Sequence, residues 1–252
     1  MKKSILVKIF LRSFFIHAAL NFRRMQNLGF AMAIIPLIRE LRLKEKDSES
    51  MLNRHLQMYN SHPYFSAPLI GSVVRLEEEQ SGKTGLVDIP AFRQSLMSSY
   101  AAIGDTFFWG ALRPLAGIIA AYLAFMGFII APIAFILIYT PAHFWIRIKG
   151  FIEGYKRGKQ GIKFIRSMDL LRVSVKLRWL SLLTLTVLSI WLTYGWYWPF
   201  IEDTSGIIVK SAALASILPS FFLIKKGVSQ IYIIYGAFVI FLLIISCREL
   251  FN

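Results

Sequence analysis

Three long uncharged stretches constrain most strongly what this chain can fold into. They cover residues 115–140, 179–201 and 227–247, and each is near or above the ~20 residues that an α-helix needs to cross the hydrocarbon core of a bilayer. A fourth stretch, residues 211–224, is shorter and contains a proline, as expected for a tilted or re-entrant helix. The sequence therefore predicts an all-α integral membrane protein with about four membrane-crossing helices in its C-terminal half.

Composition and charge agree with this class. Hydrophobic residues make up 56% of the 252 residues and the net charge is +15. Basic residues interleaved with apolar stretches are typical of loops held on the cytoplasmic side of a membrane, so we favour this explanation over nucleic-acid binding. Residues 142–178 hold ten Lys or Arg against Glu153 and Asp169, which predicts a basic cytoplasmic loop. This assignment places the N-terminus in the cytoplasm and the C-terminus outside.

The N-terminal region, residues 1–114, has a different pattern. Residues 3–24 mix apolar positions with Lys8, Arg12, Arg23 and Arg24, which predicts an amphipathic helix lying along the membrane surface. Residues 27–38 and 63–74 are apolar but too short to span, and both contain proline or glycine. Such interrupted segments are tolerated at membrane depth only inside protein or beside a water-filled cavity, so we expect re-entrant or interfacial helices here.

Residues that carry covalent chemistry are sparse. The single cysteine, Cys247, excludes disulfides and paired-cysteine metal sites. The sequence contains no phosphate-binding Gly-Lys-Ser/Thr loop, no paired-His zinc motif and no nucleophile elbow. We therefore expect no cofactor, no metal and no enzymatic step on this chain alone; a membrane-bound transferase is the remote alternative.

Three long motifs occur in order: FIHAALNFRRMQNLGFAMAIIPLI, RHLQMYNSHPYFSAPLIGSVVRLEEE and AIGDTFFWGALRPL. They closely resemble the IID component of the mannose-type (mannose, fructose, sorbose) phosphotransferase system, and GFIEGYKRG and LIKKGVSQIYIIYGAFVI are also similar to it. The resemblance implies a subunit of the bacterial inner membrane that pairs with a IIC subunit to form a passage for a hexose-class sugar. Separate IIA and IIB phosphocarriers would phosphorylate the sugar, and IIC–IID pairs would form a higher oligomer.

One departure from the family pattern leaves an alternative open. The family usually has a Gly-Pro-containing stretch before AGIGD, where this chain has LMSSYAAIGD. The missing glycine and proline would alter a bend close to the proposed passage. A non-transporting regulatory or assembly subunit derived from the same family is therefore the alternative function.

Asp105 and Arg113 immediately precede the first long apolar stretch. In a straight helix they would be ~12 Å apart along the axis and could not pair. Gly104, Gly110 and Pro114 would allow a fold-back that brings the two charges together or aims both at a cavity. We predict that Asp105 binds sugar hydroxyls or a partner loop in a desolvated site. The alternative is that Asp105 caps a helix and Arg113 reaches the membrane interface.

A second candidate site combines Asn60, His62 and Tyr64 at the start of a short apolar segment. Aromatic rings with amide or imidazole groups are side chains that sugar recognition uses, so these residues are predicted to line the passage; turn closure and an interfacial tyrosine are the alternatives. Glu78 belongs to a short acidic run. It is predicted to lie on a solvated face or to form a salt bridge with a basic neighbour, and contact with the sugar or with IIB is the alternative.

Two basic groups are candidates for partner contacts. Arg23, Arg24 and Asn27 are predicted to contact the IIC subunit, with anionic membrane lipid as the alternative. A cationic surface steers acidic partners, so a second group is predicted to dock the IIB phosphocarrier, with topology determination as the alternative. This second group is Lys156, Arg157 and Lys159.

Overall fold

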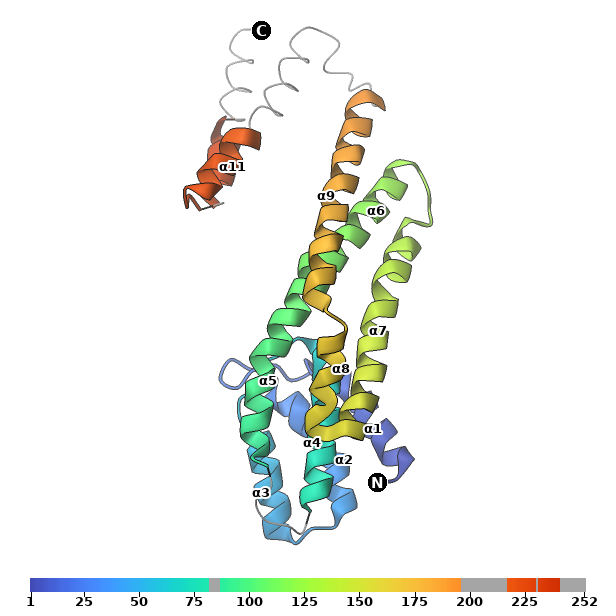
Figure 1. Cartoon of the computed structure of the whole chain (residues 1–252), viewed down its shortest axis with the longest axis vertical. Helices are drawn as coiled ribbons and strands as arrows, with labels where there is room; N and C mark the ends of the chain where they lie inside the picture. The colour runs from blue at the N-terminus through green and yellow to red at the C-terminus, as the bar shows by residue number, and fades with distance from the viewer. Residues whose placement is uncertain (82–86, 196–216, 230, 241–252) are drawn as a thin grey trace. The chain divides into compact units, whose positions relative to one another are not determined.

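The computed structural model describes residues 1–81, 87–195, 217–229 and 231–240. The chain divides into two units, Met1–Ser189 and Ile190–Asn252, which are treated separately. The described residues are predominantly helical, with isolated β-bridges as their only extended pairing, so the all-helical prediction is confirmed. The helices of the first unit (Figure 1) are α1 (Lys3–Ser13), α2 (Asn27–Leu41), α3 (Glu45–His55), α4 (Pro63–Gln80), α5 (Ile89–Gly104), the π-helix η1 (Asp105–Leu112), α6 (Arg113–Phe125), α7 (Ala131–Arg157), the 3₁₀ turn η2 (Gly158–Gly161), α8 (Ile162–Ser167) and the start of α9 (Leu170–Gly195).

Helix α4 is the buried centre of the first unit. Every residue from 65 to 74 is buried, as expected for a helix that is apolar all round. Its main neighbour is α7, and the two backbones approach closely: a Cβ on Gly71 would meet the Phe151 carbonyl, and one on Gly154 would meet the Pro68 carbonyl. The short apolar segment 63–74 therefore lies inside the protein.

Helices α5, η1 and α6 form one continuous helical run, Ile89–Phe125, which is long and apolar enough to cross a membrane. The predicted fold-back is wrong, because the chain passes from α5 through η1 into α6 without a break at Gly104, Gly110 or Pro114. The turns of η1 are wide: the Arg113 N–H donates to the Phe108 carbonyl, five residues earlier. The run also continues through residue 114, where the sequence predicted a division between two regions.

Hydropathy predicts one membrane span over residues 115–140. The structure instead has two helices there, joined by a turn at residues 126–130. Gly127 ends α6 in the left-handed region, with φ +79°. The Phe128 N–H then donates to the Leu123 carbonyl at 2.9 Å, which satisfies a carbonyl left free at the helix end. Helices α6 and α7 therefore form a hairpin.

Residues 142–178 are mainly helical, so the predicted basic loop is wrong as a structural description. Helix α7 runs on to Arg157, and η2, α8 and the start of α9 follow with only short breaks. Gly158 makes the first turn possible, since its φ is +52°. The ten basic side chains consequently project from helices.

The predicted amphipathic helix over residues 3–24 ends at Ser13. The Ser13 hydroxyl donates to the Phe10 carbonyl at 2.6 Å, and such local bonds compete with helix propagation. Further along, the Asn21 side chain accepts from the Arg24 N–H at 2.8 Å, and Met25 has φ +56°. Residues 14–26 are therefore mainly turns.

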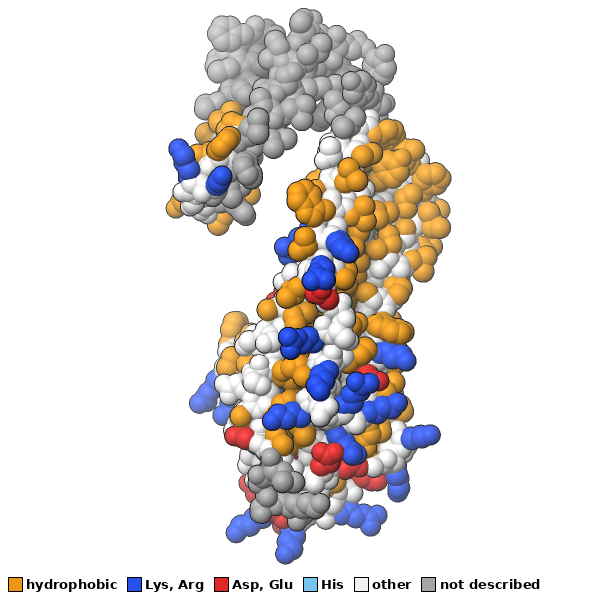
Figure 2. All heavy atoms as spheres, viewed as in Figure 1, with side chains coloured by type: hydrophobic (Ala, Val, Ile, Leu, Met, Phe, Trp, Pro, Cys, Tyr) orange, Lys and Arg blue, Asp and Glu red, His pale blue; other side chains and the backbone are white. Residues whose placement is uncertain are grey.

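Exposed side chains divide the first unit into two zones (Figure 2). Large apolar side chains cover α6, α7 and the upper part of α9, whereas charged side chains gather around the N-terminal helices and α8. A continuous exposed apolar surface of this kind marks a lipid-facing region. Among the apolar residues more than half exposed are Phe125, Ile133, Leu137, Trp145, Leu182 and Leu183.

The structure describes parts of the remaining predicted spans in the second unit. Helix α11 covers Ile217–Lys225 and so overlaps the predicted stretch 211–224, and a further apolar helix covers Ile231–Ile240. Residues 211–216, 230 and 241–247 of these stretches lie outside the described residues, as do residues 196–201 of the stretch 179–201, whose earlier part belongs to α9.

Candidate functional site

Side chains from three elements converge at the start of α4. His62 caps this helix, because its Nδ1 accepts the Tyr64 N–H at 3.3 Å. The His62 ring is stacked on Phe108 of η1, with centroids 5.3 Å apart, and lies 5.0 Å from the Trp109 ring. The predicted residues His62 and Tyr64 thus belong to a larger group. We call it the aromatic cluster: His62, Tyr64, Phe108, Trp109, Tyr139, His143 and Arg147.

Helix α7 contributes three members of the aromatic cluster at intervals of four residues. The Tyr139 hydroxyl donates to the Tyr64 hydroxyl at 3.2 Å. His143 stacks on the Tyr64 ring, with centroids 4.6 Å apart, and the Arg147 guanidinium lies 5.1 Å from the centroid of the same ring. Tyr64 is therefore surrounded by side chains that can hydrogen-bond or stack with a polar ligand.

Arg147 is a buried cation with no carboxylate partner among the described residues. Its guanidinium lies 4.3 Å from the Phe14 ring centroid and makes a long contact of 3.5 Å with the Ser13 carbonyl. Aromatic faces stabilise such a cation in part. Its Nε, together with His62 Nε2 and His143 Nδ1, is buried without a hydrogen-bond partner in the described part of the chain. The aromatic cluster therefore has unused hydrogen-bonding capacity.

Burial and charge fix the protonation state of His62. Burial, followed by the Arg147 cation and His17, lowers the pKa of His62 to about 3. The ring is consequently neutral near pH 7. Because Nδ1 accepts from the backbone, the proton sits on Nε2, which is the unpaired atom and is available as a donor.

A hydrogen-bonded frame holds the segment before His62. The Gln26 amide donates to the Ser61 carbonyl at 2.7 Å and accepts the Ser61 N–H at 3.1 Å. The Ser61 hydroxyl donates to the Met97 carbonyl of α5 at 3.1 Å. This frame positions His62 between α2 and α5 and explains why an irregular segment can be rigid.

The other predicted passage residues have different positions. Asn60 is exposed, and its N–H contacts the Met97 sulfur at 3.0 Å. Asp105 and Arg113 are both exposed, and no ion pair joins them in the structure as described. Asp105 begins η1 directly after Gly104, where any Cβ would meet the His62 ring. Asp105 therefore follows directly the residue that packs against the His62 ring of the aromatic cluster.

Sequence reasoning missed Phe108, Trp109, Tyr139, His143 and Arg147. The last three share one helix face, since residues four apart are neighbours on a helix surface. The four-residue spacing of Tyr139, His143 and Arg147 is visible in the sequence, across the end of the apolar stretch 115–140 and the start of the basic segment 142–178. Trp109 is 47% exposed, so the aromatic cluster reaches the surface beside it.

In the first group of predicted partner residues, Arg24 and Asn27 make hydrogen bonds within the chain. Arg24 and Asn27 donate to the same Leu56 carbonyl, at 3.2 and 2.7 Å. Asn27 is buried and also accepts from the Asn21 amide at 2.8 Å. These bonds tie the turn before α2 to the end of α3, whereas Arg23 is exposed.

The predicted salt bridge of Glu78 is present. Its carboxylate pairs with the N-terminal amine, accepts from the Tyr155 hydroxyl at 2.7 Å and lies 3.7 Å from Arg75. Although burial alone would raise it, these hydrogen bonds and charges lower the pKa of Glu78.

The second group of predicted partner residues lies where α7 ends. Arg157 pairs with Glu153 at 2.7 Å, Lys159 is exposed in η2, and Lys156 lines a pocket between α1 and α7. Among the residues that the structure describes, no cluster of His, Cys, Asp and Glu is suited to hold a metal ion.

An exposed apolar zone on long helices, joined to a helical body with a polar surface, defines an all-helical membrane protein. The chain belongs to the family described as the PTS system mannose/fructose/sorbose family IID component, which matches residues 1–250. It is therefore a IID membrane component of a sugar phosphotransferase system.

Individual relatives agree with the family. The chain is 29% identical to the fructose permease IID component of Bacillus subtilis (strain 168), over 94% of this chain and 93% of the relative. It is 32% identical to the mannose-specific EIID component of Escherichia coli (strain K12), over 62% of this chain and 56% of the relative.

Two solved structures are similar over nearly the whole fold. One is described only as a membrane protein, with a TM-score of 0.75. The other is a chain in the cryo-EM structure of the mannose transporter ManYZ with microcin E492, with a TM-score of 0.60. Each is 26% identical to this chain and covers 98% of it and 97% of the solved chain.

Proposed function

We propose that this chain pairs with a IIC subunit and that the two subunits together form the passage for a hexose-class sugar. Separate IIA and IIB phosphocarriers phosphorylate the sugar, and the present chain contributes binding, orientation and gated access. The observation that carries the proposal is the family match over residues 1–250. The names of the relatives, which specify fructose and mannose, support a sugar of this class.

We place the sugar-facing surface of this subunit at the aromatic cluster and Asp105. Trp109 is exposed and offers an aromatic face for a sugar ring. The Tyr64 hydroxyl, which accepts from Tyr139, and neutral His62 at Nε2 each offer a donor for a sugar hydroxyl. Asp105 is exposed at the start of η1 and can accept hydroxyl hydrogen bonds. Asn60 and Arg113 remain predicted contacts at the edge of this surface.

The partner surfaces follow the distribution of charge. We assign the side carrying the ten basic residues of 142–178 to the cytoplasm, where Arg157 and Lys159 would steer an acidic IIB partner. Arg23, exposed in the turn before α2, is the IIC contact we favour in its group. Under this arrangement the N-terminus is cytoplasmic and IIC–IID pairs assemble into a higher oligomer.

Sugar uptake in cells that lack their own mannose-type IID component tests the proposal. This chain is restored with its cognate IIC, IIA and IIB partners, and phosphoenolpyruvate-dependent uptake is measured. We expect uptake with the native chain and a reduction of about tenfold or more in Asp105→Ala and Tyr64→Ala, as for loss of a hydrogen bond or ring contact to a bound ligand. Asp169→Asn, an exposed position paired with Arg172, is the matched control and should transport normally.

Two outcomes would contradict the proposal at different levels. Absence of uptake despite a stable membrane complex with IIC would favour a regulatory or assembly subunit, in line with the LMSSYAAIGD departure. Normal uptake and normal sugar affinity in both site variants would support a transport function but would show that the aromatic cluster and Asp105 do not line the passage.

A further inference from the structure

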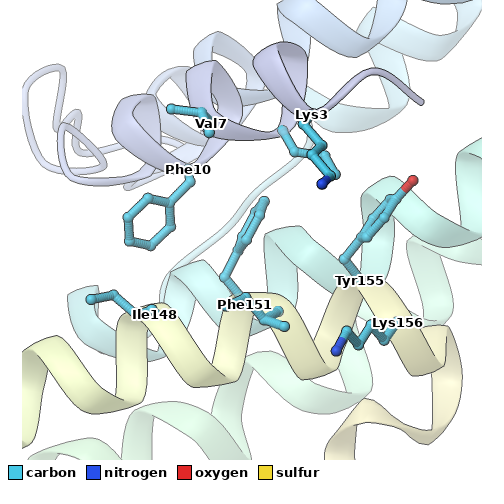
Figure 3. Close-up of a pocket in the computed structure, with 9 residues that line it drawn as sticks. Lys3, Val7, Phe10, Ile148, Phe151, Tyr155 and Lys156 are labelled. Atoms are coloured by element: carbon cyan, nitrogen blue, oxygen red, sulfur yellow. The ribbon is translucent and has the colours of Figure 1, made fainter.

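A pocket opens between α1 and α7, away from the aromatic cluster (Figure 3). Its volume is about 490 Å³, and most of its lining is aliphatic or aromatic. Phe10, Val7 and Ile148 lie at one end, and Lys3 and Lys156 lie at the other. The pocket surface is apolar: its apolar end lies at Phe10, and at its lysine end the two lysine side chains line it with their aliphatic stems. Its remaining lining residues are Leu6, Phe151, Ile152 and Tyr155.

The two lysines are available to a ligand. Both are exposed, and neither has an ion pair among the described residues. The nearby carboxylates are already engaged: Glu78 pairs with the N-terminal amine and with Tyr155, and Glu153 pairs with Arg157. Two cations at one rim without a carboxylate of their own favour an anionic group from outside the chain.

The apolar end continues the lipid-facing surface of α7. Trp145, Ile148 and Ile152 are 54%, 42% and 38% exposed, and they follow one another along the helix until Lys156. The Lys149 ammonium lies 5.4 Å from the Trp145 ring centroid. A tryptophan and lysines at the end of an apolar helix surface mark the membrane–water interface.

We propose that this pocket binds one anionic phospholipid, with an acyl chain between Phe10 and Ile148 and the phosphate between Lys3 and Lys156. The lipid fixes α1 against α7, and thereby the N-terminal amine against Glu78. The site depends on the membrane location of the chain and not on sugar transport. Lys156 then contacts lipid, whereas Lys159, which is exposed and has no ion pair among the described residues, remains available to a protein partner.

Lipid binding to the purified full chain tests the proposal. Native mass spectrometry in detergent compares phosphatidylglycerol with phosphatidylcholine of the same acyl chains. We expect preferential retention of phosphatidylglycerol, weakened about 25-fold in Lys3→Gln/Lys156→Gln, since each lysine near an anionic lipid contributes about fivefold. Lys8→Gln/Lys159→Gln removes the same charge from outside the pocket and should leave binding within about twofold of the native chain.

Equal retention of both lipids, or equal losses in the two double variants, would overturn the proposal. A second measurement examines the apolar end in the native membrane. A benzophenone amino acid in place of Val7 should cross-link to phospholipid when the chain is expressed with its partners. Cross-linking to the IIC subunit instead would show that a protein segment covers the pocket.

Discussion

The Arg178 Nε of α9 donates a hydrogen bond to the Gly110 carbonyl of η1 at 3.1 Å. Pro114 has no N–H, so it cannot donate to the carbonyl four residues earlier, which is that of Gly110. Arg178 supplies the missing donor. Gly110 also makes the approach possible, because a Cβ there would lie 2.9 Å from an Arg178 terminal nitrogen.

This contact predicts that Arg178→Met destabilises the junction between α9 and the α5–η1–α6 run. The expected loss is about 1 kcal/mol of unfolding free energy, typical of one hydrogen bond at an accessible position. Thermal unfolding of the purified chain in detergent measures it. Arg172→Met removes an exposed pair with Asp169 instead, and a loss as large as that of Arg178→Met would contradict the prediction.

Close packing of α4 on α7 predicts that Gly71→Ala is destabilising. The added Cβ would meet the Phe151 carbonyl, and overpacking of this kind costs about 1–3 kcal/mol. Gly117→Ala in α6 is the matched control, since nothing lies within 4 Å of its Cβ position. The control should be neutral or slightly stabilising because alanine favours helix. Equal unfolding midpoints for Gly71→Ala and Gly117→Ala would contradict the close approach of α4 to α7 at Gly71.

The buried carboxylate of Glu77 predicts a large effect of neutralisation. Glu77 accepts from Arg54 Nε at 2.9 Å and pairs with His55 Nε2 at 2.8 Å. Although burial alone would raise it, the bonds from His55 and Arg54 lower the pKa of Glu77. Glu77→Gln should cost roughly 3 kcal/mol, as for breaking a buried ion pair.

Glu79→Gln controls for the loss of one negative charge. Glu79 pairs with Arg75 at an exposed position, where such pairs are worth about 0–1 kcal/mol. Denaturant or thermal unfolding compares the two variants. Similar stability of Glu77→Gln and Glu79→Gln would mean that the buried carboxylate does not hold α3 on α4.

Neutral His62 predicts an acid-dependent loss of stability. Its pKa is about 3 in the folded chain and about 6.5 when unfolded. Only the unfolded state takes up this proton as the pH falls from 6.5 toward 3, so the folded state loses about 2 kcal/mol by pH 5. His62→Asn keeps a capping side chain and removes the titration.

Unfolding midpoints at pH 8 and pH 5 check this sign. The variant is expected to be less stable than the native chain at pH 8, because it loses the stack on Phe108, but to change less between the two pH values. His55, whose pKa burial also lowers, is present in both proteins and contributes the same slope. An unchanged pH dependence in His62→Asn would show that His62 does not titrate in this way.

The membrane-protein class, the family and two residues of the aromatic cluster were predictable from the sequence. Uncharged runs near helix-spanning length predicted membrane helices, and the ordered motifs predicted the IID family, since both signals depend only on local residue types. His62 and Tyr64 were predicted because they lie two residues apart in one motif. Arg147 was not, because it lies more than eighty residues from Tyr64 and only helix packing brings them together.

The sequence by itself determined that the chain is apolar, basic, helical and built for a membrane. Tertiary structure decided that residues 63–74 form a buried core helix and that 115–140 folds as a hairpin around Gly127. The physical reason is that hydropathy measures how much a segment avoids water. Lipid and protein interior satisfy an apolar segment equally well, so packing against α7, and not composition, selects between them.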